Sequence, residues 1–166
     1  MARIQKVAVL GGGLMGSGIA QVAAGAGFPT TVREVSRELA DKSRQSIERM
    51  LAKGIERGKV TDKERDTVLG NLEFATDIRD LAGADLFIEA VVEDLEVKNS
   101  LWGQLKEIAK PNAIFASNTS SLTIVAMAAA SGRPDKMLGL HFFNPVPMMK
   151  LVEVVRTITT SDEGEA

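Results

Sequence analysis

Short apolar runs alternate along this chain with longer segments in which apolar residues recur every three or four positions. The short runs are typical of buried strands, and the longer segments are typical of helices that cover a sheet. Strands are predicted over Ile4–Leu10, Pro29–Glu34, Leu72–Ala75, Leu86–Val92, Ala113–Ser117, Met137–His141 and Leu151–Val155. Helices are predicted over Leu14–Ala26, from the cap Ser36 to about Arg57, from Thr61 onward, over Leu95–Ala109 and over Leu122–Ala130. This alternation predicts a doubly wound α/β fold with a mostly parallel sheet.

Polar residues mark helix starts and a domain end. Ser36 is placed as an N-cap, and Thr61 with Glu64 matches the S/T-x-x-E capping box. A length of 166 residues suits one domain, which we expect over residues 1–159. The acidic segment 160–166, TSDEGEA, is expected to be a linker or a frayed end.

Composition excludes several classes of partner. The net charge of −2 argues against general affinity for nucleic acid or an anionic membrane, since either would need a basic face. No apolar stretch approaches the roughly 20 residues of a membrane span. The chain starts with a strand-like run that glycines interrupt early, so no signal peptide is predicted. We therefore expect no nucleic acid and no membrane among the partners.

The inventory of reactive residues is short. Without cysteine the chain can form neither disulfides nor thiolate sites, and a cytoplasmic location is the simplest expectation. A single histidine and no tyrosine leave no multi-histidine metal site and no tyrosine acid. Acid–base chemistry must then use His141, lysines or carboxylates, and no metal is expected.

The stretch GGGLMGSG, residues 11–18, supplies a G-x-G-x-x-G pattern through Gly11, Gly13 and Gly16. A predicted strand precedes it, a helix follows, and Glu34 ends the next strand 18 residues after Gly16. This context favours a Rossmann-like dinucleotide site, in which pyrophosphate meets the N-terminus of the helix, over a tight turn without ligand.

The acidic residue also bears on the choice of cofactor. A carboxylate at Glu34 can accept hydrogen bonds from ribose hydroxyls and repel a 2′-phosphate, which favours NAD over NADP. Arg33 and Arg37 lie nearby and could weaken that preference, although a solvated helix start is the simpler interpretation of both. FAD can use the same glycine pattern.

Two further segments follow predicted strands, where ligands bind in open α/β sheets. Glu89 interrupts an apolar strand and needs a partner if it is buried. Glu93 and Lys98 are in reach of a nicotinamide ribose. For Glu93 and Asp94, capping of the next helix is an equally good interpretation. In SNTSSL, residues 117–122, helix capping is favoured over ligand binding.

Taken together, GGGLMGSGIA, IEAVVEDLEVK, FASNTSSL and GLHFFNPVPMMKLVEVV strongly resemble the 3-hydroxyacyl-CoA dehydrogenases, in order and spacing, over nearly the whole chain. The resemblance implies an oxidoreductase of fatty acid metabolism and β-oxidation. It implies NAD-dependent interconversion of (S)-3-hydroxyacyl-CoA and 3-ketoacyl-CoA, with an acyl-CoA thioester as substrate.

The resemblance also implies roles for individual residues. It makes His141 the general base and Glu153 its carboxylate partner, and a turn through Asn144–Pro147 could bring them together. Ser120 matches a serine near the substrate hydroxyl, and Asn144 matches an amide at the nicotinamide. The loop and the resemblance together give as cofactor-binding residues Gly11, Gly13, Leu14, Met15, Gly16, Glu34, Glu93, Lys98, Ser120 and Asn144. Position 34 is usually Asp in the family, and here it is Glu.

Family members continue for about a hundred residues as a helical domain, near the usual size of a second domain. That domain supplies much of the acyl-CoA cleft and the dimer interface. We therefore expect a fragment or truncated product that binds NAD but is weakly active or inactive alone, from a parent protein that is a homodimer through the absent helical domain.

Two other functions stay open. One is a hydroxy-acid dehydrogenase with a lysine base, for which Lys150 is the candidate. The other is a non-catalytic nucleotide-binding module, because a fold does not establish an activity.

Overall fold

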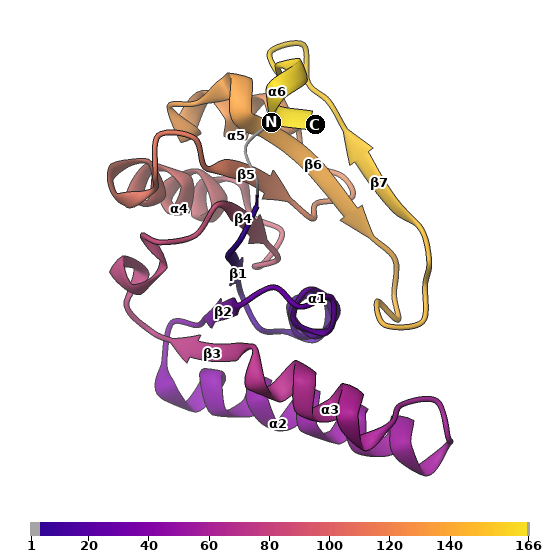
Figure 1. The fold of residues 1–166 in the computed structure, drawn as a ribbon. Helices are drawn as coiled ribbons and strands as arrows, with labels where there is room; N and C mark the ends of the chain where they lie inside the picture. Colours follow the sequence, from indigo (N-terminus) through magenta and orange to yellow (C-terminus); the bar gives the residue numbers. More distant parts are fainter. Residues whose placement is uncertain (1–3, 166) are drawn as a thin grey trace.

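The structure, a computed structural model that describes residues 4–165, is a seven-stranded sheet with helices on both faces (Figure 1). The strands are β1 (Val7–Leu10), β2 (Thr30–Arg33), β3 (Leu72–Ala75), β4 (Leu86–Glu89), β5 (Ile114–Ser117), β6 (Met137–Phe142) and β7 (Val152–Val155). Their order in the sheet is β3-β2-β1-β4-β5-β6-β7. The first six are parallel, and β7 pairs antiparallel with β6. The predicted Rossmann-like, mostly parallel α/β fold is confirmed.

The helices divide between the two faces. They are α1 (Leu14–Gly25), α2 (Arg37–Glu56), α3 (Asp62–Gly70), α4 (Leu95–Ile108), α5 (Ile124–Ser131) and α6 (Asp162–Glu165), with 3-10 helices η1 (Ile78–Leu81) and η2 (Pro134–Lys136). One apolar cluster joins the sheet to α1, α2 and α3, and a second joins it to η1, α4 and α5. The sheet therefore lies between two helical layers.

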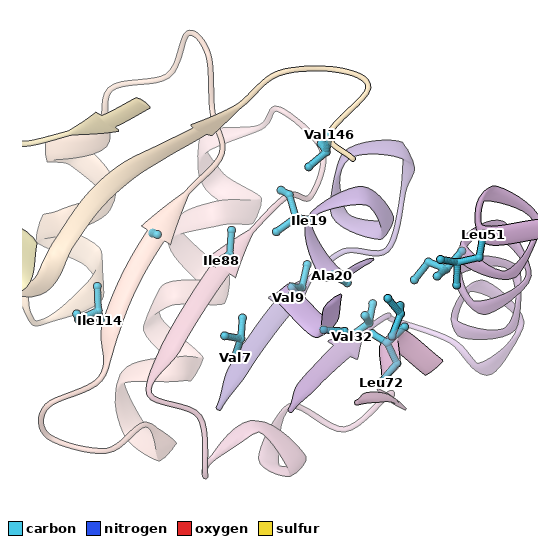
Figure 2. Packing of buried hydrophobic residues seen from close by; sticks show 14 of the residues in the cluster. Val7, Val9, Ile19, Ala20, Val32, Leu51, Leu72, Ile88, Ile114 and Val146 are labelled. Atoms are coloured by element: carbon cyan, nitrogen blue, oxygen red, sulfur yellow. The ribbon is translucent and has the colours of Figure 1, made fainter. Parts of the chain in front are cut away.

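Alternation along each strand builds both clusters, because successive strand side chains point to opposite faces. In β1, Val7 and Val9 belong to the cluster with α1, whereas Ala8 and Leu10 belong to the cluster with α4. Figure 2 shows the first cluster, with Val7 and Val9 on the strand and Ile19 on α1. Burial on both faces explains why these strands are continuous apolar runs in the sequence.

The turn between β6 and β7 is anchored on α1. Val146, in that turn, is 4% exposed and lies beside Ile19 in the same cluster (Figure 2). A Cβ placed on Gly18 of α1 would come 2.8 Å from the Val146 Cβ, so a glycine there lets the turn approach the helix. This contact holds the β6–β7 hairpin over the carboxyl edge of the sheet.

Several strands and helices begin or end at other residues than predicted, because side chains accept hydrogen bonds from backbone amides there. The first strand starts at Val7 rather than Ile4, since the amides of Gln5 and Lys6 both donate to the Asp85 carboxylate at 3.0 Å. The strand predicted over 86–92 ends at Glu89, where the side chain accepts from the Val91 amide at 2.8 Å.

The fifth long helix shifts for the same reason. It spans Ile124–Ser131 rather than Leu122–Ala130, because the Leu122 amide donates to the Thr119 hydroxyl at 2.9 Å. Both 3-10 helices lie outside the predicted elements. In contrast, Ser36 and the Thr61–Glu64 capping box act as predicted.

The acidic tail expected to be a linker or frayed end contacts the domain over its described part, and residue 166 lies outside the described residues. The Thr160 hydroxyl donates to the Met137 carbonyl at 2.7 Å, and the Ser161 amide donates to the Asp135 carbonyl at 2.9 Å. Hydroxyl and amide groups in the segment thus donate to carbonyls in η2 and at the start of β6, and α6 follows.

Candidate functional site

The candidate site lies at the carboxyl edge of the parallel strands, where the strand order reverses between β1 and β4. Ligands of open α/β sheets bind at such a reversal. A groove of about 940 Å³ runs past the glycine loop, Glu34 and the start of α4. A second cavity of about 430 Å³ lies beneath the end of β6. The two adjoin, because Met15, Ala90 and Val91 line both.

The glycine loop is shaped by close backbone contacts. Gly11 has φ of 91°, and a Cβ there would lie 2.8 Å from the carbonyl oxygen of Ala90. A Cβ on Gly16 would lie 1.7 Å from the carbonyl oxygen of Gly11. A Cβ on Gly13 would have no atom within 4 Å, since this residue faces the groove.

Helix α1 presents its N-terminus to that groove. Its N-cap, Gly13, has no side chain to cap the helix, and no acidic residue lies in the first turn. The first amide groups of the helix and the positive end of its dipole can therefore serve an anion. The loop geometry fits a dinucleotide pyrophosphate.

Glu34 turns back toward the loop. Its carboxylate accepts from the Gly12 amide at 2.5 Å and from the Val35 amide at 3.3 Å. The two nearby arginines are engaged elsewhere: Arg33 donates to the Thr76 carbonyl at 3.2 Å, and Arg37 pairs with Asp41 at 3.2 Å. Glu34 lines the groove, and Arg33 lines it as well.

Glu89 is fully buried at the end of β4, and it has the partners that its burial requires. The Lys98 ammonium, itself 1% exposed, lies 2.8 and 3.0 Å from its two oxygens. The Ser117 hydroxyl donates to the same carboxylate at 2.6 Å. Lys98 also pairs with Glu93 at 2.8 Å, so one ammonium joins two carboxylates.

The structure separates the roles of Glu93 and Asp94. Asp94 is the N-cap of α4 and accepts from the amides of Glu96 and Val97 at 2.9 and 3.0 Å. Glu93 lines the cavity instead.

The hydroxyl-rich segment supports Glu93 and does not cap α5 as expected. Thr119 and Ser121 donate to the Glu93 carboxylate, whereas the N-cap of α5, Thr123, makes no side-chain cap. Partial burial raises the pKa of Glu93, but hydrogen bonds from Lys98 and Thr119 outweigh it, so the pKa lies below its ordinary value of 4.5. Glu93 is therefore ionised at neutral pH.

His141 and Glu153 lie opposite each other in the β6–β7 ladder. The imidazole Nδ1 is 2.8 Å from the Glu153 carboxylate, and the ring packs against Phe143 with centroids 4.6 Å apart. A bond at Nδ1 leaves Nε2 as the ring atom that can exchange a proton with a ligand in the cavity. The hairpin predicted from the Asn-Pro turn thus brings the pair together.

Most predicted site residues converge on the two hollows. The cavity is lined by Met15, Glu93, Lys98, Ser120, His141 and Asn144. The groove is lined by Gly11, Gly13, Leu14, Met15 and Glu34. Gly16 is buried beneath the loop, and Glu153 reaches the cavity through His141. Lys150 is exposed in the turn before β7 and does not line the cavity.

Asn118 was not predicted as a site residue. Its side-chain oxygen accepts from the Phe142 amide at 2.9 Å and so holds the strand end beside His141, and it lines the cavity. Its position directly after a buried strand was the signal in the sequence.

Across residues 4–165, no helix is long and apolar enough to cross a membrane.

Comparison with known proteins gives a consistent picture. The family described as "3-hydroxyacyl-CoA dehydrogenase, NAD binding domain" matches residues 6–164. A probable 3-hydroxybutyryl-CoA dehydrogenase of Deinococcus radiodurans is 52% identical over 158 residues, which are 95% of this chain and 56% of that protein. The 3-hydroxybutyryl-CoA dehydrogenase of Mycobacterium tuberculosis is 49% identical over 164 residues, which are 98% of this chain and 57% of that protein.

Solved structures agree with these relatives. The crystal structure of FadB2 from M. tuberculosis superposes with a TM-score of 0.95 at 48% identity, covering 98% of this chain and 57% of that one. A 3-hydroxybutyryl-CoA dehydrogenase from Escherichia coli K12 superposes with a TM-score of 0.94 at 44% identity, covering 98% and 34%. The chain thus spans a little over half the length of the first curated relatives that it matches.

The lowered pKa of Glu93 predicts how the stability lost in the Glu93→Gln variant depends on pH. A carboxylate with a depressed pKa stabilises the fold fully above the unfolded-state value, and this contribution is lost as the pH falls through that value and then the folded one. The stability lost in Glu93→Gln should therefore shrink as the pH falls from neutral to below 4.5. The free energy of unfolding of both proteins at each pH can be measured by urea unfolding, followed by the fluorescence of the single tryptophan, Trp102. A loss that stays constant or grows on acidification would contradict the assignment.

Proposed function

Because this chain belongs to the 3-hydroxyacyl-CoA dehydrogenase family, as its NAD-binding domain, we propose that it serves an oxidoreductase that interconverts (S)-3-hydroxyacyl-CoA and 3-ketoacyl-CoA. The observation that carries the proposal is the hydrogen-bonded His141–Glu153 pair on the cavity that adjoins the glycine-loop groove. Such a pair beside a nicotinamide site can accept a proton while a hydride leaves the same carbinol.

His141 is the proposed general base. Its Nε2 takes the proton of the 3-hydroxyl, and its Nδ1–H donates to Glu153, which stabilises the imidazolium that forms. Bound NAD⁺ would supply the acceptor for the hydride of C3, and loss of that hydride and of the hydroxyl proton would convert C3–OH into C3=O. In the reductive direction the imidazolium returns its proton to the oxygen. Ser120 and Asn144 line the same cavity and are proposed to orient the reacting oxygen and the carboxamide.

Separate parts of the groove are proposed to hold the cofactor. The uncapped start of α1 meets the pyrophosphate, Glu34 meets the adenosine ribose, and Glu93 with Lys98 meets the nicotinamide ribose. A carboxylate at position 34 favours NAD over NADP, while Arg33, which also lines the groove, donates to the Thr76 carbonyl and Arg37 pairs with Asp41.

The relatives are nearly twice as long as this chain, so the activity of a whole protein is proposed and an acyl-CoA thioester is its proposed substrate. The expected homodimer and the cytoplasmic location stay predictions. The lysine-base alternative loses support, because Lys150 lies outside the cavity lining. A non-catalytic nucleotide-binding module is the remaining alternative, and only turnover distinguishes it.

Two glycine variants separate folding from cofactor binding. Gly13→Ala places a methyl group in the open groove, so the Tm should hold while NADH affinity falls by about tenfold or more. Gly16→Ala forces a methyl group onto the Gly11 carbonyl and should lower the Tm itself. Gly70→Ala, where a Cβ also has no atom within 4 Å, is the matched control and should change neither. Undiminished NADH binding by Gly13→Ala would argue against a pyrophosphate at this loop.

We expect this chain to bind the cofactor but to catalyse the reaction slowly or not at all. The purified chain should bind NADH yet reduce acetoacetyl-CoA far more slowly than the M. tuberculosis relative assayed beside it. His141→Gln should keep the NADH affinity and remove the residual rate, since the amide cannot transfer the proton. A rate near that of the relative would refute the first expectation, and an unchanged rate in His141→Gln would remove His141 from the mechanism.

A further inference from the structure

Three charged side chains form one cluster at the wall of the cavity: Glu93 and Lys98, which line it, and Glu89 behind them. Two of them are withdrawn from water, since Glu89 is fully buried and Lys98 is 1% exposed. Two carboxylates and one ammonium give the cluster a net charge of −1. The proposed function uses Lys98 and Glu93 but leaves the role of Glu89 unexplained.

Burial makes this net charge effective. Charges that water does not surround are poorly screened, so the cluster acts over several ångströms with more force than a surface group. Lys98 is also the only lysine or arginine among the described residues that line the cavity. Without Glu89, the ammonium would neutralise Glu93 and the cluster would carry no charge.

The negative charge distinguishes the two redox forms of the cofactor. The nicotinamide ring of NAD⁺ is a cation, whereas the ring of NADH is neutral. A cluster of charge −1 beside that ring therefore stabilises the oxidised form relative to the reduced one. A second carboxylate, Glu153, lies nearby, but it is half exposed and paired with His141.

We propose that Glu89 is a positioning residue that offsets the charge of Lys98 and thereby raises the affinity of the site for NAD⁺ relative to NADH. The proposal rests on the proposed function, because it needs a nicotinamide in the His141 cavity. Glu89 has no contact with the cavity lining except through Lys98 and the backbone, and it is absent from that lining.

Glu89→Gln removes the charge and can keep every hydrogen bond of the carboxylate except the one from Lys98 to Oε2 at 3.0 Å, because an amide nitrogen at that place cannot accept. The amide oxygen can take the place of Oε1, which accepts from Lys98 and from the Val91 amide at 2.8 Å each. The amide nitrogen can take the place of Oε2 and donate to the Ser117 hydroxyl, which can reverse its role. The net charge of the cluster then changes from −1 to 0.

The test is a pair of calorimetric titrations, with NAD⁺ and with NADH, on each variant of the chain. Glu89→Gln should lower the ratio of NAD⁺ affinity to NADH affinity by about three- to tenfold. Glu89→Asp keeps the charge and should keep the ratio. Ser117→Ala removes a hydrogen bond but no charge, and it should keep the ratio too. If Glu89 had a purely structural role, its replacement would weaken the binding of both cofactors alike and leave the ratio unchanged.

A double variant sharpens the test. Glu89→Gln with Lys98→Met leaves Glu93 alone and returns the net charge to −1, and it removes both charges of the buried pair together, so that no buried charge is left unpaired. Its ratio should return toward that of the wild type even if both affinities fall. If Glu89→Gln does not fold, Glu93→Gln removes the same charge at a half-exposed position and should shift the ratio in the same direction.

The outcomes are distinct. A wild-type chain that binds neither cofactor overturns the proposed function and this inference with it. Binding of both cofactors with no change of ratio in Glu89→Gln, or in Glu93→Gln where the first does not fold, overturns the inference alone. A double variant whose ratio stays at the Glu89→Gln value also overturns it, because the charge would then not be the cause.

Discussion

The buried ion pair between Lys98 and Glu89 is the interaction on which the site depends. Removing an ammonium or a carboxylate from water costs about several kcal/mol per ion even in real proteins, and close pairing with added hydrogen bonds must offset that cost. Here the Ser117 hydroxyl and the Val91 amide donate further hydrogen bonds to the Glu89 carboxylate, and Glu93 forms a second ion pair with the Lys98 ammonium. Helix α4 is thereby fixed against β4 and β5, and Glu93 is held at the cavity.

The pair also accounts for a departure of the chain from a regular strand. Because the Glu89 side chain takes the amide of Val91, β4 ends at Glu89 and the backbone turns toward the glycine loop. The same turn brings the Ala90 carbonyl so close to Gly11 that a Cβ would not fit. The tight glycine loop and the charged cavity wall therefore meet at the turn that follows β4.

Much of this was accessible from the sequence. Continuous apolar runs predicted the strands, because both of their faces are buried. The family resemblance paired His141 with Glu153, the Asn-Pro turn made a hairpin between them plausible, and the structure shows the two residues opposite each other. Glu89 was recognised as needing a partner. Its partner was not predicted, because Lys98 lies on another element and only the packing of α4 on the sheet brings the two together.

Other features were ambiguous for a physical reason. Thr119 and Ser121 could cap a helix or support a ligand site, since the same hydroxyl groups serve both purposes, and the fold uses them to hold Glu93. Side chains that capture backbone amides, such as Asp85 with Gln5 and Lys6, shortened strands that propensity alone extends. The described part of the acidic tail contacts the start of β6 through long-range hydrogen bonds that composition cannot reveal.

The proposed NAD site at this edge of the sheet is formed by the glycine loop and Glu34. Paired fluorescence titrations with NADH and NADPH test it most directly, because the two cofactors differ only by the 2′-phosphate that would face the Glu34 carboxylate. Saturable NADH binding that is about tenfold or more tighter than NADPH binding is the predicted result. Equal or tighter binding of NADPH, or no saturable binding of either cofactor, would rule out this site for NAD.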